Sequence, residues 1–165
     1  MLHYAVVDKS SGVVGGYQAL RNPDPLHSKV DIGAIYWGPG IARRRGGSEA
    51  FYLFVTYVFD TLGYNRFGWR SNNQNTRSTR AASRFGFTFE GIARVPRVVW
   101  KGYGRDMAYY SMLLDVEWPL MKKALELWLL PENFDEAGMQ RERLEDVRRR
   151  LDKLKKVPQS FTLAS

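Results

Sequence analysis

Residues 29–48 read KVDIGAIYWGPGIARRRGGS, and this stretch decides the fold. The run at 29–37 is rich in β-branched and aromatic residues and predicts a strand. The glycines and the proline at 38–40 end it. A basic segment and two more glycines follow. A helix is then predicted from Ser48 to about Leu62, because its apolar residues recur at steps of three and four.

The junction between that strand and that helix has the features of an anion-binding site. The first N–H groups of a helix have no partner within the helix, and the helix dipole is positive at that end. Arg43, Arg44 and Arg45 lie in the junction and add charge-assisted donors. The alternative is an arginine-rich surface loop capped by Ser48. The stretch lacks the GK[ST] ending of a Walker A loop and the GxGxxG spacing of a dinucleotide-binding loop.

The other segments predict an α/β fold. Their order along the chain is strand, strand, strand, helix, strand, helix, strand, strand, which indicates a sheet with both parallel and antiparallel pairs. We divide the chain into a domain at 1–118, a C-terminal helical extension at 119–157 and a flexible tail at 158–165. The further strands are expected at 3–8, 13–20, 65–70, 87–99 and 107–114, and the further helices at 75–85, 120–130 and 136–156.

Composition narrows the classes of function. The 165 residues include no cysteine, which excludes disulfides, thiolate catalysis and cysteine-bound metals. His3 and His27 stand in no recognisable ligand spacing, so we expect no metal. The net charge of +8 favours an anionic partner, which is a nucleic acid, an acidic lipid or a phosphorylated small molecule. The sequence carries no signal peptide and no apolar run of membrane-spanning length, so a cytoplasmic protein is expected.

Several motifs resemble a known family. Ile32-Gly33, Trp37-Gly38-Pro39 and ARRRGGSEA at 42–50 are similar to the acetyl-CoA pyrophosphate loop of the GNAT acetyltransferase superfamily, closest to its RimJ/RimL-like N-acetyltransferases. Downstream, the pattern N-x-x-S-x-x-A-x-x-x-x-G-F at 75–87 resembles the second cofactor motif of that branch. The resemblance covers roughly residues 4–119.

The resemblance implies the acyl-CoA N-acyltransferase fold, a mixed twisted β-sheet with helices on both faces, here followed by the helical extension. Two parallel strands, 29–37 and 65–70, would splay apart, and the pantetheine arm of acetyl-CoA would pair with the first of them. Acetyl-CoA is the implied co-substrate, with no metal. The implied cofactor-binding residues are Ile35, Tyr36 and Trp37 for the arm, Arg43, Arg44, Arg45, Gly46, Gly47 and Ser48 for the pyrophosphate, Asn75 for the arm, and Arg77 and Arg80 for the outer phosphate.

The implied reaction is acetyl transfer from acetyl-CoA to an amine by direct attack in a ternary complex, the amine being a protein N-terminus or a small molecule. The amine must first lose a proton, and Asp31 is the candidate base, directly or through water. The alternative for Asp31 is a strand carboxylate paired with an arginine. Ser78 would protonate the leaving thiolate, or else serve as a second helix-capping hydroxyl. Asn75 would bind the arm, cap its helix, or do both.

The sequence also departs from the family pattern. It begins after the first strand and two helices of the family. We expect either a truncated sequence, or a natural short form in which the helices at 120–130 and 136–156 or a partner subunit rebuild that wall. The loss should expose sheet surface, so a homodimer or a partner that covers it is expected. Ala42 stands where the family usually has Gln, and Arg44 where this branch often has Thr. Ala82 stands where many members have a tyrosine that acts as the general acid. These departures favour, as an alternative, a degenerate domain that binds CoA or a partner without turnover. A nucleic-acid binder is a third hypothesis, although the basic and aromatic residues match no known module.

Overall fold

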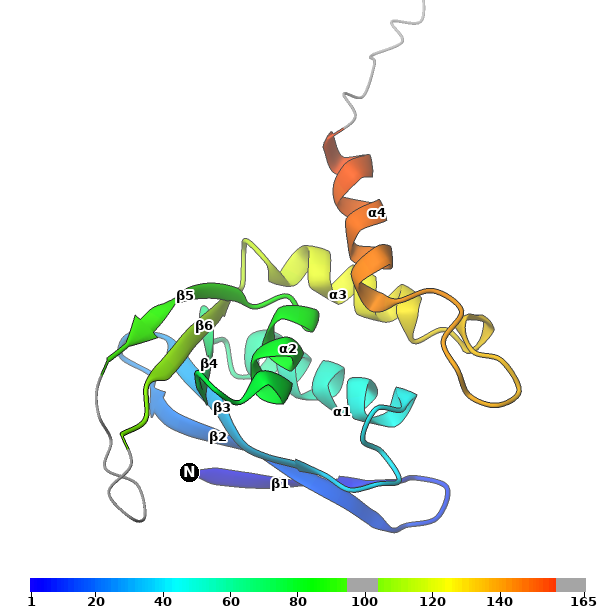
Figure 1. Ribbon diagram of the computed structural model, residues 1–165, viewed down its shortest axis with the longest axis horizontal. Coiled ribbons are helices and arrows are strands. Elements are labelled where there is room, and N and C mark those ends of the chain that lie inside the picture. Colours follow the sequence, from blue (N-terminus) through cyan, green and yellow to red (C-terminus); the bar gives the residue numbers. More distant parts are fainter. Residues whose placement is uncertain (95–103, 157–165) are drawn as a thin grey trace, which may run out of the picture.

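A mixed sheet forms the body of the protein (Figure 1). The structure, a computed structural model, describes residues 1–94 and 104–156. Within them the strands lie in the order β1-β2-β3-β4-β6-β5, and β3 and β4 are the parallel neighbours, whereas the other pairs are antiparallel. The strands are β1 (Leu2–Val7), β2 (Val14–Asp24), β3 (Lys29–Trp37), β4 (Arg66–Asn72), β5 (Thr88–Ala93) and β6 (Met107–Leu113).

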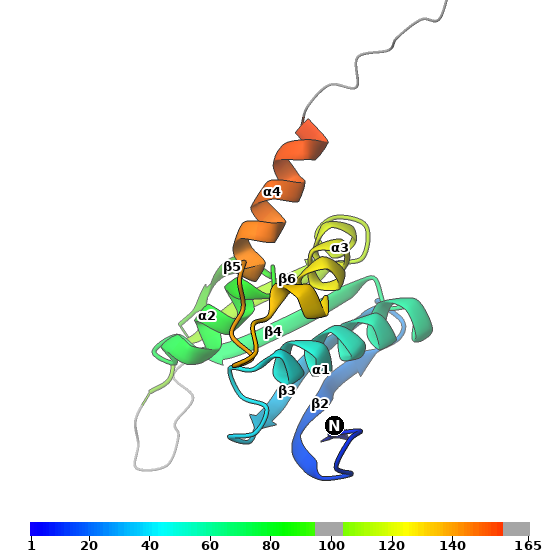
Figure 2. The ribbon, with the colours of Figure 1, turned by 90° about the vertical axis from the view of Figure 1, so that its right-hand side faces the viewer.

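The helices gather over one face of this sheet, as Figures 1 and 2 show. Side chains of a strand alternate between faces, and in β4 Phe67 and Trp69 point toward the helices, where both pack against the ring of Phe87. Phe51 and Phe85 stack at 3.8 Å between ring centroids. The helices are α1 (Arg45–Thr56), followed by the π-helical turn η1 (Tyr57–Thr61), then α2 (Thr76–Arg84), α3 (Trp118–Trp128), the 3₁₀ turn η3 (Pro131–Asn133) and α4 (Leu144–Lys156).

The predicted α/β class with a mixed sheet is confirmed. Among the described residues, the helices lie on one face only, and the opposite face carries polar and aromatic side chains such as Arg70 and Tyr109. The expected helix from Ser48 begins three residues earlier and changes to a π-helical turn at Tyr57. The expected strand 87–99 is β5, which ends at Ala93.

The last predicted helix, 136–156, is wrong at its start, since α4 begins at Leu144. The Asp135 carboxylate accepts the backbone N–H groups of Ala137 and Met139, and Gly138 has a φ of 75°. Such a side chain-closed turn competes with helix formation. The expected strand residues 95–99 and the flexible tail 158–165 lie outside the described residues.

The C-terminal extension shares the core of the sheet domain. Met121 and Leu125 of α3 and Leu144 and Val147 of α4 are buried in the same hydrophobic cluster as Phe67. The upper part of α4 projects from the body (Figure 2). In the part of the chain that the structure describes, no helix is both long and apolar enough to span a bilayer.

Candidate active site

The two parallel strands, β3 and β4, diverge at the centre of the sheet. Pairing between β3 and β4 runs from Lys29 opposite Arg66 to Ile32 opposite Trp69. Both strands continue beyond that pair, β3 to Trp37 and β4 to Asn72, without further register partners between them. The far half of β3 therefore presents backbone groups that β4 does not use.

A bulge in β3 explains why the strands diverge. Opposite β2, the register steps from Gly33 paired with Ala19 to Tyr36 paired with Tyr17, which is three residues on β3 against two on β2. Within this extra step Ala34 has a φ of 47°. A bulge bends its strand and strengthens the local twist. Nothing in our reading of the sequence predicted it, because a non-glycine residue in the left-handed region leaves no clear signal.

The end of the loop after β3 and the first turn of α1 supply unpaired donors. We call these residues, 43–48, the anion loop. Among the described residues, the backbone N–H groups of Arg43, Arg45, Gly46 and Ser48 donate to no backbone carbonyl outside the helix. No side chain caps α1, and its first turn holds no acidic residue. The alternative that Ser48 caps the helix is therefore wrong, since the N-cap position is Arg44. Free donors at the positive end of a helix dipole suit an anion.

The two glycines of this loop have different environments. A Cβ on Gly47 would lie 2.7 Å from the backbone oxygen of Ile41, so this position requires glycine for the chain's own packing. A Cβ on Gly46 would come no closer than 3.6 Å to the Ile41 side chain, which is ordinary contact. The chain's own packing therefore does not require glycine at position 46, and the lack of a side chain there lets a ligand approach the backbone.

The N-terminus of α2 positions Asn75 and Ser78 beside β4. Asn75 caps α2, because its Oδ1 accepts the Ser78 N–H at 3.2 Å. The Ser78 hydroxyl oxygen accepts the indole N–H of Trp69 at 2.9 Å. In the described residues neither the Asn75 amide N–H groups nor the Ser78 hydroxyl proton has a hydrogen-bond acceptor. Both groups thus keep donors for a ligand.

Asp31 lies on the opposite face of the sheet from Ser78. Its Oδ2 accepts the Asn22 amide at 3.0 Å and forms an ion pair with Arg70. Because Trp69 and Arg70 are neighbours in β4, their side chains point to opposite faces, so Asp31 and Ser78 approach the diverging strands from the two sides. The structure thus shows the arginine pairing that was the alternative for Asp31, at the edge of the gap where a base would be needed.

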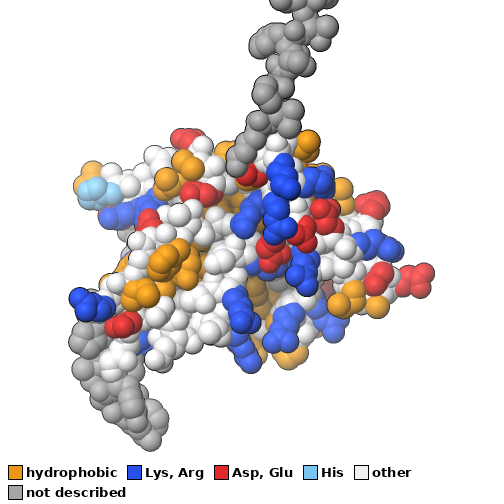
Figure 3. Space-filling model, turned by 45° about the horizontal axis from the view of Figure 1, so that its top comes forward, with side chains coloured by type: hydrophobic (Ala, Val, Ile, Leu, Met, Phe, Trp, Pro, Cys, Tyr) orange, Lys and Arg blue, Asp and Glu red, His pale blue; other side chains and the backbone are white. Residues whose placement is uncertain are grey.

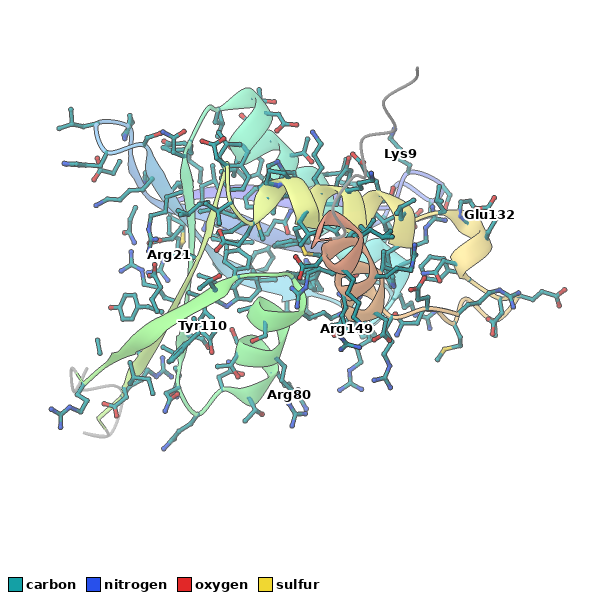
Figure 4. All side chains as sticks on the ribbon, turned by 90° about the horizontal axis from the view of Figure 1, so that it is seen from above. Lys9, Arg21, Arg80, Tyr110, Glu132 and Arg149 are labelled. Atoms are coloured by element: carbon teal, nitrogen blue, oxygen red, sulfur yellow. The ribbon has the colours of Figure 1, made fainter. Side chains whose placement is uncertain are left out.

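The outer arginines surround the site as exposed charges. Arg77 and Arg80 are exposed on α2, and Figure 4 shows Arg80 on the outer side of that helix. Basic side chains gather on the face that carries α2 and α4 (Figure 3). Within residues 1–94 and 104–156 no group of three or more His, Asp or Glu side chains is arranged to hold a metal ion.

A second ion pair joins Arg66 and Glu90 on the sheet face that the described helices do not cover, which we call the open face. Arg66 donates to both oxygens of Glu90 at 2.7 and 2.6 Å, and the Ser111 hydroxyl donates to Glu90 at 2.8 Å. The hydrogen bond from Arg66, with a smaller contribution from Ser111, holds the pKa of Glu90 below its ordinary value against the opposing effect of partial burial. Its pairing with Arg66 and Ser111 gives Glu90 a structural role.

Our reading of the sequence missed one residue of this region. Arg84, at the end of α2, donates to the Ser48 hydroxyl at 3.1 Å and so reaches the first turn of α1. Its guanidinium lies over the ring of Trp128 in α3. No local pattern links these residues, which are separated along the chain and meet only through tertiary packing.

The comparisons with known proteins agree with this geometry. Residues 1–88 match the family described as acetyltransferase (GNAT) domain. The chain is similar to the crystal structure of a GCN5-related N-acetyltransferase from Brucella melitensis, with 53% identity over 90% of this chain and 66% of that chain and a TM-score of 0.84. It is also similar to a GNAT-family structure from Chromobacterium violaceum, with 38% identity over 71% of this chain and 58% of that chain and a TM-score of 0.66. The chain thus spans 66% or less of the length of these two structures. No protein of curated function matches it.

Proposed function

The chain belongs to the GNAT acetyltransferase family, and from that premise we propose that it transfers an acetyl group from acetyl-CoA to an amine by direct attack in a ternary complex. One observation carries the proposal. The parallel strands β3 and β4 diverge after Ile32 and Trp69, directly beside a helix N-terminus with unpaired N–H groups. An extended thioester arm and its diphosphate need these two features next to each other.

Different residues around the gap between β3 and β4 would bind different parts of acetyl-CoA. The amides of the pantetheine arm would pair with the free backbone edge of β3 at Ile35, Tyr36 and Trp37, as an added strand does. The diphosphate would accept the free N–H groups of the loop, where Gly46 leaves room, and Arg43 and Arg44 add positive charge. Asn75 would donate its amide to the arm, and Arg77 and Arg80 would attract the outer phosphate.

The two proton transfers of the reaction would take place on opposite faces of the sheet. The amine would reach the gap from the open face, where Asp31 accepts its proton directly or through water. The neutral nitrogen then attacks the thioester carbonyl carbon, the new C–N bond forms, and the C–S bond breaks. The nitrogen loses its second proton to solvent as the amide forms, and the thiolate takes a proton from Ser78 on the helix face. Ser78 regains a proton from solvent and Asp31 releases the one it accepted, so the products are the acetylated amine and CoA with a free thiol.

Titration and turnover test the proposal separately. Calorimetry with acetyl-CoA should show saturable binding to the native chain. Gly46→Glu should abolish it because the added carboxylate repels the diphosphate, and a Cβ at this position makes only ordinary contact with Ile41. Release of free thiol should then depend on an added amine, tested with a peptide that has a free N-terminus and with a polyamine. Failure of acetyl-CoA to bind the native chain would overturn the proposal.

The second candidate is a CoA-binding domain without turnover. The pairing of Asp31 with Arg70 favours it, because a carboxylate oxygen that already accepts bonds from Arg70 and Asn22 is less available to an incoming amine. Binding of acetyl-CoA without thiol release for any amine would establish this candidate.

We also propose that a second copy or a partner covers the open sheet face. The rings of Tyr17 and Tyr36 stack there at 5.7 Å while remaining 44% and 54% exposed. Exposed aromatic side chains of this kind are typical of interfaces. Sedimentation of the chain as a monomer at micromolar concentration, with no associated protein, would argue against it.

A further inference from the structure

Two arginines near the anion loop rest on an aromatic pair from the C-terminal extension. The rings of Trp128 and Phe134 meet edge to face, with centroids 5.0 Å apart. The guanidinium of Arg84 lies over Trp128 at 5.0 Å, and that of Arg45 lies over Phe134 at 5.5 Å. We call these four residues the cation–aromatic cluster. It joins the start of α1, the end of α2 and the segment after α3.

The cluster holds positive charge without a neutralising partner. Within residues 1–94 and 104–156 neither Arg45 nor Arg84 forms an ion pair, and Arg84 donates its hydrogen bond to the neutral hydroxyl of Ser48. Burial lowers the pKa of Arg84, and the charge of Glu145 partly opposes this through space. A guanidinium nevertheless stays charged at neutral pH. Both guanidinium groups therefore add positive charge at the already positive end of α1, which favours binding of an anion there.

The segment that carries the aromatic pair is itself held in place. The Asn133 amide donates to the backbone oxygens of Trp128 at 2.9 Å and of Glu142 at 3.2 Å, and its Oδ1 accepts the Glu142 N–H at 2.8 Å. The indole N–H of Trp128 donates to the Gln140 side chain at 3.1 Å. These bonds tie both ends of the turn together, so the rings are positioned before any ligand binds.

We propose that the C-terminal extension forms part of the cofactor site, because Trp128 and Phe134 hold Arg84 and Arg45 at the first turn of α1 and so raise the affinity for the diphosphate. The inference rests on the proposed binding of acetyl-CoA to this loop. Both aromatic residues lie beyond residues 1–88, which match the family domain. Arg84 acts through Ser48 and is a positioning residue, whereas Arg45 belongs to the loop itself.

Steady-state kinetics with two acetyl donors test the proposal. Acetyl-CoA carries the diphosphate, and S-acetylpantetheine lacks it. For acetyl-CoA, Phe134→Leu should raise KM about two- to fivefold, as expected for one lost cation–π contact. Arg84→Met should raise KM about tenfold, because the variant loses both the hydrogen bond that positions Ser48 and a positive charge beside it. The kcat at saturation should stay unchanged. Arg84→Lys should restore part of the affinity, and kcat/KM for S-acetylpantetheine should not respond to any of these variants.

A matched control and a double mutant separate this idea from a loss of packing. Phe89→Leu removes an exposed ring on β5 that has no arginine contact in the described residues, and it should leave KM unchanged. Because Arg45 lies on the loop surface, Arg45→Met should fold normally. If Phe134 acts through Arg45, Phe134→Leu should have little further effect in the Arg45→Met background.

The outcomes distinguish the role of the C-terminal extension from the proposed binding of acetyl-CoA. Unchanged KM for acetyl-CoA in Phe134→Leu and Arg84→Met, with native binding intact, would overturn the role of the extension. Equal losses with both donors would also overturn it, since they would indicate a general defect. If the native chain shows no acetyl-CoA binding by calorimetry, the proposed function itself fails.

Discussion

The indole N–H of Trp69 donates a 2.9 Å hydrogen bond to the hydroxyl oxygen of Ser78. This contact fixes the Ser78 side chain at the point where β3 and β4 diverge. Because the oxygen already accepts a bond, the hydroxyl proton is directed elsewhere, which suits a group that donates a proton to a departing thiolate.

Ser78→Ala should lower kcat for thiol release by about 100-fold or more, in the range of general acid catalysis, while KM for acetyl-CoA changes little. The neighbouring Thr79→Ala removes a hydroxyl that bonds only the backbone of its own helix turn, so it serves as the control. Equal kcat values for the two variants would assign Ser78 to capping alone.

Asp31→Asn should lower kcat/KM for thiol release by about 100-fold, because an amide cannot accept the proton of the amine. Asn22→Ala is the matched control, because it removes a hydrogen bond to the carboxylate and leaves its charge. If both variants reduce activity equally, the loss does not come from the carboxylate as a proton acceptor, and Asp31 is not the base.

Alanine substitutions at Gly46 and Gly47 should have different effects, one on the affinity for acetyl-CoA and the other on the free energy of unfolding. Gly47→Ala places a Cβ 2.7 Å from a backbone oxygen and should lower the free energy of unfolding by about 1–3 kcal/mol. Gly46→Ala should fold like the native chain yet bind acetyl-CoA more weakly, since the methyl group occupies the open side of the loop. Denaturant titration and calorimetry measure the two effects, and a Gly46→Ala variant with native affinity would place the diphosphate elsewhere.

Asn75 should show both of its roles. Asn75→Ala should lower the free energy of unfolding by about 1 kcal/mol through loss of the cap. Asn75→Ser can still cap α2 and should restore stability, but it cannot restore the amide donor, so KM for acetyl-CoA should remain raised. A serine variant with native KM would leave Asn75 with the cap alone.

The lowered pKa of Glu90 predicts that the free energy of unfolding depends on pH. Its pKa is lower in the folded protein than its ordinary value of 4.5, so the unfolded chain binds the proton more tightly. The stabilisation is therefore fully present above that ordinary value and is lost as the pH falls through the lowered one. Glu90→Gln should reduce stability at neutral pH by no more than about 1 kcal/mol, because the pair is about one third exposed.

The difference between the native chain and Glu90→Gln should shrink as the solution becomes acidic. Thermal unfolding across the acidic range measures it, with the exposed Glu132→Gln as control. A difference that stays constant with pH would exclude a contribution from the lowered pKa.

Local chemistry determined much of this protein. The apolar run at 29–37, the glycines that follow and the three- and four-residue spacing after Ser48 predicted β3 and α1 to within a few residues. The Asn75 cap was also readable, because capping depends on residues three apart. The turn around Asp135 was not foreseen, since charged residues at 136–143 suit a helix as well as a loop, and side-chain hydrogen bonds decided between them.

Tertiary structure decided how the site is put together. The bulge at Ala34, the ion pair of Asp31 with Arg70 and the contact of Arg84 with Ser48 all join segments that are distant in sequence or depend on the twist of neighbouring strands. A sequence specifies donors, charges and periodicity by residue type. Which of them face each other depends on register and packing, and these are fixed only when the whole core closes.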